Sequence, residues 1–139
     1  RTDLPFAVIH LESGVAIGAT RYLEIRQAHR ALEIGGTWYA LDFQRTAVNT
    51  ECKYLLLRHA FEELGCLRVQ FKTDVRNERS QRALERIGAV KEGVLRKHMI
   101  LPDGTIRHLD ICYASLAVDR NPAGQKEASY HGLHARHAV

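Results

Sequence analysis

Residues 44–65 read QRTAVNTECKYLLLRHAFEELG, a polar loop followed by a long apolar pattern. From position 48 onward, apolar side chains recur at steps of three and four residues, which is typical of an amphipathic helix. The pattern stops at Gly65, and glycine commonly ends helices because it adopts a left-handed conformation without strain. We therefore predict one helix over residues 48–65, entered through a loop of small and polar residues.

The segments on both sides of this helix are predicted to be β-strands. Residues 67–73 alternate apolar and polar side chains, which is the two-residue period of a half-buried strand. Before the helix, residues 6–10, 15–25 and 30–41 are strand-like runs separated by short turns, which predicts an antiparallel meander. A strand, a helix and another strand in succession predict a parallel crossover.

Glycines, a helix-capping residue and a hairpin turn complete the expected fold. Gly35 and Gly36 lie side by side within the third predicted strand, which indicates a β-bulge or a close approach by another chain or a ligand. Asn77 can cap a shorter helix that ends at Gly88, and residues 90–101 and 106–116 form a predicted hairpin. The fold class is therefore α+β, with a mixed, mostly antiparallel twisted sheet and a long and a short helix packed on it.

Composition limits what this chain can be. Its 139 residues, 45% hydrophobic and 26% charged with a formal net charge of +4, suit one domain and exclude disordered or collagen-like chains. We expect a domain over residues 1–118 and a disordered tail over 119–139. No run of 18 apolar residues exists, which excludes a membrane-spanning helix, and no leader follows Arg1.

Cysteine and histidine usage points to a reducing compartment without a metal. Three cysteines without paired spacing favour a cytoplasmic location and no disulfide. His131, His134 and His137 recur every three residues, but in an expected tail this spacing is weak support for a metal site, and we predict no metal.

The loop before the long helix has the composition of an anion site. A strand that runs into small residues and then a helix amino end presents several free backbone N–H groups at one point, which suits phosphate or pyrophosphate. The P-loop lysine and the G-x-G-x-x-G pattern are absent, which argues against nucleoside triphosphates and dinucleotides. An ordinary helix start explains the same residues, and on these residues alone both interpretations stay open.

At this loop the sequence resembles a known family. Gln44-x-x-Ala47-x-Asn49 is similar to the Q/R-x-x-G-x-G/A motif of the GNAT superfamily of acetyl-CoA-dependent N-acetyltransferases. Asn77-x-x-Ser80 also resembles this superfamily, and the later segments KEGVLR and DICY are similar to its ribosomal-protein N-terminal acetyltransferase branch. The resemblance covers residues 6–118. It implies the acyl-CoA N-acyltransferase (GNAT) fold, acetyl-CoA as cosubstrate, and a primary amine as acceptor, either a protein N-terminus or a small amine.

The resemblance also implies a set of cosubstrate-binding residues. Gln44 and the backbone amides of Arg45, Thr46, Ala47, Val48, Asn49 and Thr50 would surround the pyrophosphate, and the strand edge at Trp38, Tyr39, Ala40 and Leu41 would pair with the pantetheine amides. Asn77 would contact the cofactor arm, and Ser80 would interact with the departing thiolate, although helix capping explains both residues equally well. Arg79, Arg82 and Arg86 share a helical face spaced to meet the adenosine phosphates, and a solvated charge face is the alternative.

Glu33 is the leading candidate for a general base. The attacking amine must be neutral, so a base helps most with acceptors of high pKa. Glu33 lies eleven residues before Gln44, an offset that matches the general-base glutamate of the superfamily's histone-modifying members. The alternative is an exposed carboxylate or an ion pair with Arg30, and Glu92 and Tyr113 are further candidates for the base.

Two departures from the family pattern leave other functions open. Ala47 replaces the first motif glycine and Asn49 stands where glycine or alanine is usual, and a positive φ at position 47 would cost about 1 kcal/mol or more. Weak binding of this kind would fit a module that holds acyl-CoA without turnover. A nucleic-acid binder is a third class, but no basic stripe interleaved with aromatic residues supports it.

The family's elements before the first strand, which build much of the acceptor groove, are not found in this sequence. Without them a strand edge would be uncovered, which favours a homodimer.

Overall fold

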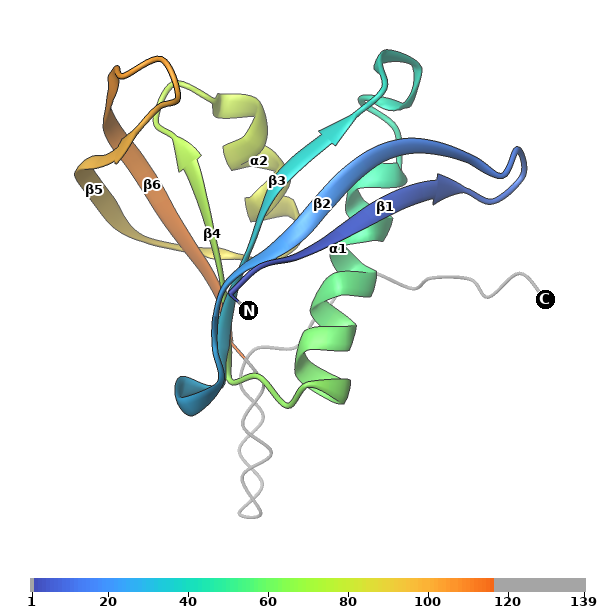
Figure 1. The fold of residues 1–139 in the computed structure, drawn as a ribbon, viewed down its shortest axis with the longest axis horizontal. Coiled ribbons are helices and arrows are strands. Elements are labelled where there is room, and N and C mark those ends of the chain that lie inside the picture. Colours follow the sequence, from blue (N-terminus) through green and yellow to red (C-terminus); the bar gives the residue numbers. More distant parts are fainter. Residues whose placement is uncertain (1, 117–139) are drawn as a thin grey trace.

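The computed structural model describes residues 2–116, apart from the side chain of His108, and this part folds as a six-stranded sheet with two α-helices on one face (Figure 1). The strand order is β1-β2-β3-β4-β6-β5. The strands are β1 (Leu4–His10), β2 (Val15–Arg26), β3 (Ala31–Tyr39), β4 (Arg68–Asp74), β5 (Val90–Ile100) and β6 (Ile106–Leu116), and the helices are α1 (Val48–Arg58) and α2 (Glu78–Arg86). The expected tail, with His131, His134 and His137, lies outside the described residues.

The predicted topology is confirmed. β1, β2 and β3 pair as an antiparallel meander, and β3 pairs with β4 in parallel after the crossover through α1. β4 then pairs antiparallel with β6, and β5 forms a hairpin with β6 at the edge of the sheet. The sheet is therefore mixed and mostly antiparallel.

β3 and β4 separate soon after they meet. Their parallel pairing covers only three positions and ends at Glu33 opposite Gln70. The register between β2 and β3 shifts just beyond this point, and Gly36 has a φ of +57°. A Cβ atom on Gly36 would lie 2.7 Å from Arg21 Nε, so the predicted bulge is confirmed, and only glycine fits here without a shift. The bulge turns the second half of β3 away from β4, whose pairing with β6 continues to Asp74.

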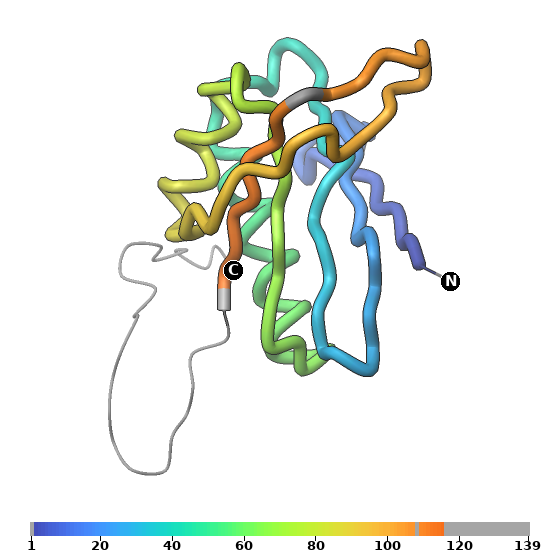
Figure 2. The backbone as a smooth tube through the Cα atoms, turned by 90° about the vertical axis from the view of Figure 1, so that its left-hand side faces the viewer, coloured from blue at the N-terminus to red at the C-terminus, as the bar shows by residue number. Residues whose placement is uncertain are grey.

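The hydrophobic core lies between the sheet and the two helices, which Figure 2 shows on one side of the strands. Its largest fully buried side chains come from β2, β3, β4 and β6, and they are Tyr22, Tyr113, Phe71, Leu32, Ile34, Ile111 and Val69. Because strand side chains alternate, Glu33 and Gln70 point to the opposite face of the sheet. The fold thus separates an apolar helix-covered face from a polar face.

The predicted helix that ends at Gly65 is confirmed, but its last turn is not α-helical. α1 ends at Arg58, and residues His59–Glu63 form a wider π-helical turn in which the Leu64 amide donates to the carbonyl oxygen of His59 at 3.0 Å. The wide turn keeps Ala60 in the core, and the chain then leaves through Gly65 at a φ of +63°. Apolar spacing cannot separate the two helix types because a single wide turn shifts the pattern by only one residue.

The third predicted strand is also too long at its carboxyl end. β3 stops at Tyr39, and Leu41–Phe43 form a 3-10 turn before the loop. Cys52, Cys66 and Cys112 are all free thiols. Within residues 2–116, no helix is long and apolar enough to cross a membrane.

Candidate active site

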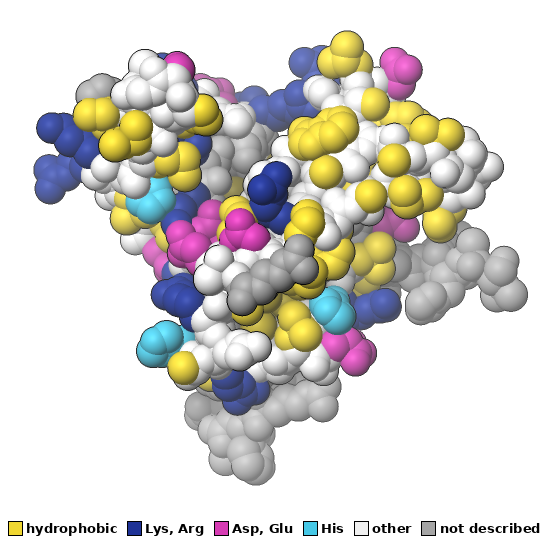
Figure 3. Space-filling view, viewed as in Figure 1, with side chains coloured by type: hydrophobic (Ala, Val, Ile, Leu, Met, Phe, Trp, Pro, Cys, Tyr) yellow, Lys and Arg dark blue, Asp and Glu magenta, His cyan; other side chains and the backbone are white. Residues whose placement is uncertain are grey.

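A cleft of about 1360 Å³ opens where β3 and β4 diverge. One wall is the second half of β3 with the loop that follows it, and the other is the end of β4 with α2. In Figure 3 the same divergence is visible as a notch between the lobe of β1–β3 and the lobe of β4–β6, with basic side chains at its upper end. The cleft is large enough for an extended cosubstrate rather than a single small ion.

The amino end of α1 opens into this cleft. The first intrahelical bond runs from the Glu51 amide to the carbonyl oxygen of Ala47 at 3.0 Å, so the amides of Asn49 and Thr50 precede the first repeating helical bond. Thr46 Oγ1 donates to the carbonyl oxygen of Phe43 at 2.8 Å and accepts from the Val48 amide at 3.3 Å, which holds the loop. Amides and the helix dipole together make this end suitable for an anion.

Ala47 is not strained. Its φ of −66° and ψ of −17° are helical, so glycine is not needed here for a left-handed conformation. The only consequence of alanine is a methyl group beside the helix amino end. The left-handed residue of the loop is instead Arg45, at a φ of +61°.

Side chains of the motif bind residues of the neighbouring strand and helix. Gln44 Nε2 donates to the carbonyl oxygen of Tyr39 at 2.9 Å, and Arg79 Nη1 donates to Gln44 Oε1 at 3.1 Å. The Tyr39 hydroxyl donates to Asn49 Oδ1 at 3.2 Å, and burial raises the pKa of this phenol above its ordinary value. Gln44 and Asn49 therefore fix the loop against β3 and α2.

Most of the predicted cosubstrate-binding residues line the cleft, and three do not. Trp38, Tyr39, Gln44, Arg45, Thr46, Ala47, Asn49, Thr50, Asn77, Ser80 and Arg82 are among its lining residues, and Ala40, Leu41 and Val48 are outside them. The Ala40 amide is engaged with the carbonyl oxygen of Ile17 at 2.7 Å, and Leu41 is an exposed residue of the 3-10 turn.

Helix α2 presents both a cap and a basic surface to the cleft. Asn77 Oδ1 accepts from the Ser80 amide at 3.0 Å, which confirms the predicted N-cap. Arg79, Arg82 and Arg86 line the cleft, and Arg82 also pairs with Glu78 at 3.2 Å with both side chains exposed. This wall is therefore positively charged.

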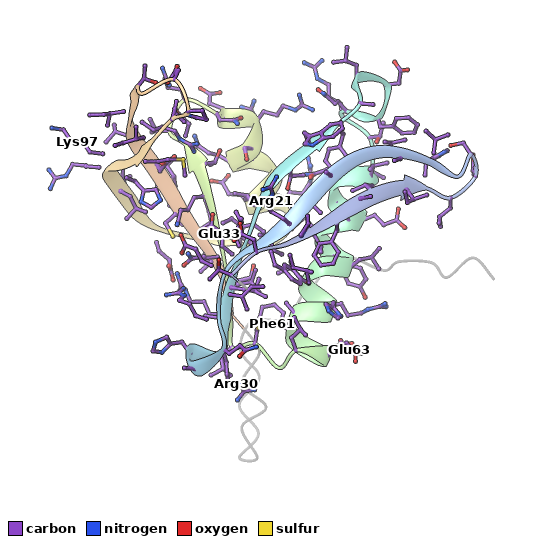
Figure 4. All side chains as sticks on the ribbon, viewed as in Figure 1. Arg21, Arg30, Glu33, Phe61, Glu63 and Lys97 are labelled. Carbon is purple, nitrogen blue, oxygen red and sulfur yellow. The ribbon has the colours of Figure 1, made fainter. Side chains whose placement is uncertain are left out.

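Glu33 lies at the apex of the divergence, on the face without helices (Figure 4). Its Oε2 accepts from Lys72 Nζ at 2.8 Å and from Gln70 Nε2 at 3.1 Å, and its side chain is only 9% exposed. Burial opposes the charge on Lys72, but hydrogen bonds to Glu33 and Glu24 raise the pKa of this lysine above its ordinary value. The expected alternative of an exposed carboxylate or a pair with Arg30 is wrong.

The side chain of Arg30 has a different role. Its Nε donates to the carbonyl oxygen of Gly65 at 2.7 Å, so it holds the end of the wide helical turn.

The two further candidates for the base are engaged elsewhere. Glu92 Oε1 accepts from Arg68 Nη1 at 2.8 Å, and this hydrogen bond holds the pKa of Glu92 below its ordinary value. The Tyr113 hydroxyl donates to Glu85 Oε1 at 2.9 Å, and burial raises the pKa of Tyr113. Neither residue lines the cleft, and Glu33 lies just outside the lining, beside Ile34.

Sequence reasoning missed Lys53, a buried lysine that lines the cleft from α1. Its Nζ donates to Thr37 Oγ1 at 2.7 Å. The available signal was its position four residues before Leu57 on the apolar stripe, where a lysine is unusual. Among residues 2–116, no group of three or more His, Cys, Asp or Glu side chains is placed to hold a metal ion.

The chain belongs to the GNAT acetyltransferase family, because the family model described as "Acetyltransferase (GNAT) domain" matches residues 1–90. The divergent parallel strands and the helix end between them fit this assignment. A curated relative is the Bacillus subtilis (strain 168) protein named "Putative ribosomal N-acetyltransferase YdaF", which is 34% identical over 116 residues, covering 84% of this chain and 61% of the relative. The resemblance to this family is confirmed.

Solved structures support the same fold. A "putative acetyltransferase" from T. thermophilus is 46% identical with a TM-score of 0.73, covering 82% of this chain and 58% of the other. A "GCN5-related N-acetyltransferase from Brucella melitensis" is 30% identical with a TM-score of 0.76, covering 83% of this chain and 51% of the other. The chain thus spans about half to three fifths of the length of these relatives.

Proposed function

We propose that this chain transfers an acetyl group from acetyl-CoA directly to a primary amine, at a protein N-terminus or on a small molecule. The observation that carries the proposal is the cleft between β3 and β4, into which the first amides of α1 open. The name of the curated relative, a ribosomal N-acetyltransferase, favours a protein amine as acceptor.

Residues on three sides of the cleft fit the parts of acetyl-CoA. The amides of residues 45–47, 49 and 50 bind the pyrophosphate, whereas the Val48 amide is bonded to Thr46 Oγ1. Arg79, Arg82 and Arg86 face the adenosine phosphates across the loop. The edge of β3 at Trp38 and Tyr39 pairs with the pantetheine amides. Asn77 contacts the same arm from α2, through the amide nitrogen that its cap leaves available.

The reaction needs a neutral amine and a stabilised leaving thiolate. The amine nitrogen attacks the thioester carbonyl carbon, the new C–N bond forms, and the C–S bond breaks with its electron pair on sulfur. Glu33 accepts the proton that the amine releases, directly or through water. Ser80, on the α2 wall of the cleft, donates a hydrogen bond to the thiolate.

Thiol release from acetyl-CoA with a panel of amines, measured beside a calorimetric binding isotherm, tests the proposal. The panel contains peptides with free N-termini, a polyamine and lysine. We expect saturable acetyl-CoA binding and release of CoA only when an amine is present. Binding without release would instead assign the chain as an acyl-CoA-binding module, and the absence of both would overturn the proposal.

The helical φ of Ala47 supports turnover over the binding-only alternative, because it removes the strain that would weaken cosubstrate binding. The cytoplasmic location and the homodimer stay predictions.

A further inference from the structure

Lys53 lies where the two strands part. Its side chain leaves α1 toward the sheet and is 7% exposed. Nζ is 2.7 Å from Thr37 Oγ1 on β3 and 5.8 Å from the centroid of the Phe71 ring on β4. The ammonium group therefore lies between β3 and β4 and lines the cleft from the side of α1.

This ammonium group has no anionic partner within residues 2–116. The ion pairs of the described chain involve other lysines and arginines, and Lys53 Nζ has one hydrogen bond, to a neutral hydroxyl. An ammonium carries three N–H donors, so two are left for other partners. A buried charge without a counter-charge is costly, and the face of the Phe71 ring offsets only part of that cost.

We infer that Lys53 binds the pantetheine arm of acetyl-CoA, its ammonium donating a hydrogen bond to a carbonyl oxygen of the arm as the arm passes between β3 and β4. The inference rests on the proposed function. The arm carries amide and thioester carbonyl oxygens and no charge, so a buried cationic donor supplies a stronger hydrogen bond than a neutral one. The cleft holds this donor between Thr37 on β3 and Phe71 on β4.

The competing explanation is a structural tie. Thr37 Oγ1 also lies 2.9 Å from Thr20 Oγ1, so Lys53 could merely hold α1 against β3 and β2 through this chain of hydroxyls. Loss of a structural tie would change the shape of the whole cleft and so weaken the binding of every ligand. Loss of a contact with the arm would weaken the binding only of ligands that contain the arm. This difference decides between them.

The charge on Lys53 gives a second signature. Burial lowers the pKa of Lys53 to about 8. Cys52 on α1 is the ionisable group that interacts with Lys53, and Tyr39 on β3 interacts in turn with Cys52. Burial raises the pKa of both, and β4 contributes the apolar Phe71 ring. Between pH 7 and 9 the change of charge next to the arm is therefore that of Lys53, and acetyl-CoA should bind more weakly as the pH rises through this range.

Calorimetric titration with acetyl-CoA and with adenosine 3′,5′-bisphosphate, which lacks the arm, tests the inference on the whole chain. Lys53→Met keeps the length and the contact with Phe71 but removes the charge and the donors. We expect Lys53→Met to weaken acetyl-CoA binding by about tenfold or more, the loss typical of one charged hydrogen bond, and to abolish its pH dependence. Adenosine 3′,5′-bisphosphate should bind as it does to the wild type.

Thr37→Val is the matched control, because it breaks the tie and keeps the ammonium. It should weaken acetyl-CoA binding less than Lys53→Met does and should keep the wild-type pH dependence. The inference is overturned if Lys53→Met weakens the binding of acetyl-CoA and of adenosine 3′,5′-bisphosphate equally, or if it binds acetyl-CoA like the wild type. It is also overturned if Thr37→Val weakens acetyl-CoA binding as much as Lys53→Met does.

The pH dependence of the wild type requires no variant, so it decides even where Lys53→Met does not fold. Acetyl-CoA affinity that stays constant from pH 7 to 9 would overturn the inference. A wild type that binds neither ligand would instead remove the proposed function itself.

Discussion

Lys72 Nζ lies 2.8 Å from Glu33 Oε2 and 3.0 Å from Glu24 Oε1, on the face of the sheet opposite α1 and α2. The side chains of Lys72 and Glu33 are 10% and 9% exposed, whereas Glu24 is 53% exposed. One lysine thus makes a nearly buried ion pair and an exposed one. Breaking the buried pair should destabilise the fold and leave Glu33 without its positioning partner, whereas breaking the exposed pair should do neither.

Removing either member of the buried pair should destabilise the fold. Lys72→Met leaves the Glu33 carboxylate without its cation, and we expect a loss of about 2–3 kcal/mol in the free energy of unfolding, somewhat less than for a fully buried pair. Glu33→Gln should lower the free energy of unfolding by a similar amount. The double variant should lose less than the sum of the two single losses. Urea denaturation at pH 7 measures this cycle. Glu24→Gln is the control, with an expected change below about 1 kcal/mol; strictly additive losses would contradict a coupled pair.

Glu33→Gln should also slow acetyl transfer. Loss of a general base commonly costs about 100-fold or more, and the effect should be largest at pH 7 with an acceptor amine of pKa near 10. At higher pH the amine is neutral already, so the gap between variant and wild type should narrow. Rates of thiol release across pH check this, with Glu24→Gln as a variant that removes a charge from the same cluster. If Glu33→Gln releases thiol at the wild-type rate at both low and high pH, Glu33 is not the base.

Asp74 should make stability sensitive to acid. Arg76 Nε and Nη2 donate to its two oxygens at 3.0 and 2.9 Å, and these bonds hold the pKa of Asp74 well below its usual range. Because the folded pKa is lower than the unfolded one, the pair stabilises the fold above about pH 4 and loses that effect as the pH falls further. Asp74→Asn should therefore lose less stability between pH 4 and 2 than the wild type does. Arg76→Gln should flatten the curve less, because the Arg76 amide still donates to Asp74 Oδ1 at 2.8 Å. Acid denaturation curves of Asp74→Asn and the wild type that run parallel would argue against this assignment.

Local signals in the sequence were sufficient for most of the fold. Three predicted features depend on neighbours close in the chain, and the structure confirms them. They are the strand alternation of residues 67–73, the cap at Asn77 and the bulge at Gly35 and Gly36. The wide turn after Arg58 has no such signal. It depends on how Ala60 packs against the sheet rather than on apolar spacing.

The site was harder to predict because its contacts join distant residues. The Glu33–Lys72 pair requires the parallel register of β3 on β4, and the bond from Arg79 to Gln44 requires α2 to lie over the loop. Neither arrangement can be predicted from the sequence of one segment alone. The backbone conformation of the loop was equally hidden, since the positive φ occurs at Arg45 rather than at the motif position Ala47.

Arg45→Gly should stabilise the fold. A residue with a side chain pays about 1 kcal/mol for a left-handed conformation, and glycine does not, although glycine gains entropy in the unfolded chain. We expect a net gain of about 0.5 kcal/mol in thermal or urea unfolding. Arg45→Ala removes the same charge but keeps the left-handed conformation of a residue with Cβ, so it should show no gain. A gain of equal size in both variants would trace the effect to charge instead.

Asn77 combines a structural and a proposed binding role, and two substitutions separate them. Its Oδ1 caps α2 through the Ser80 amide at 3.0 Å, and Asn77→Ala should cost about 1 kcal/mol of stability. Serine caps helices as well as asparagine does but has no amide nitrogen to reach a carbonyl of the cofactor arm. Asn77→Ser should therefore keep wild-type stability and bind acetyl-CoA several-fold more weakly, as measured by unfolding and calorimetry on the same samples. If Asn77→Ser binds acetyl-CoA like the wild type, capping is the whole role of this residue, and the pantetheine arm finds its partners on β3 and α1 instead.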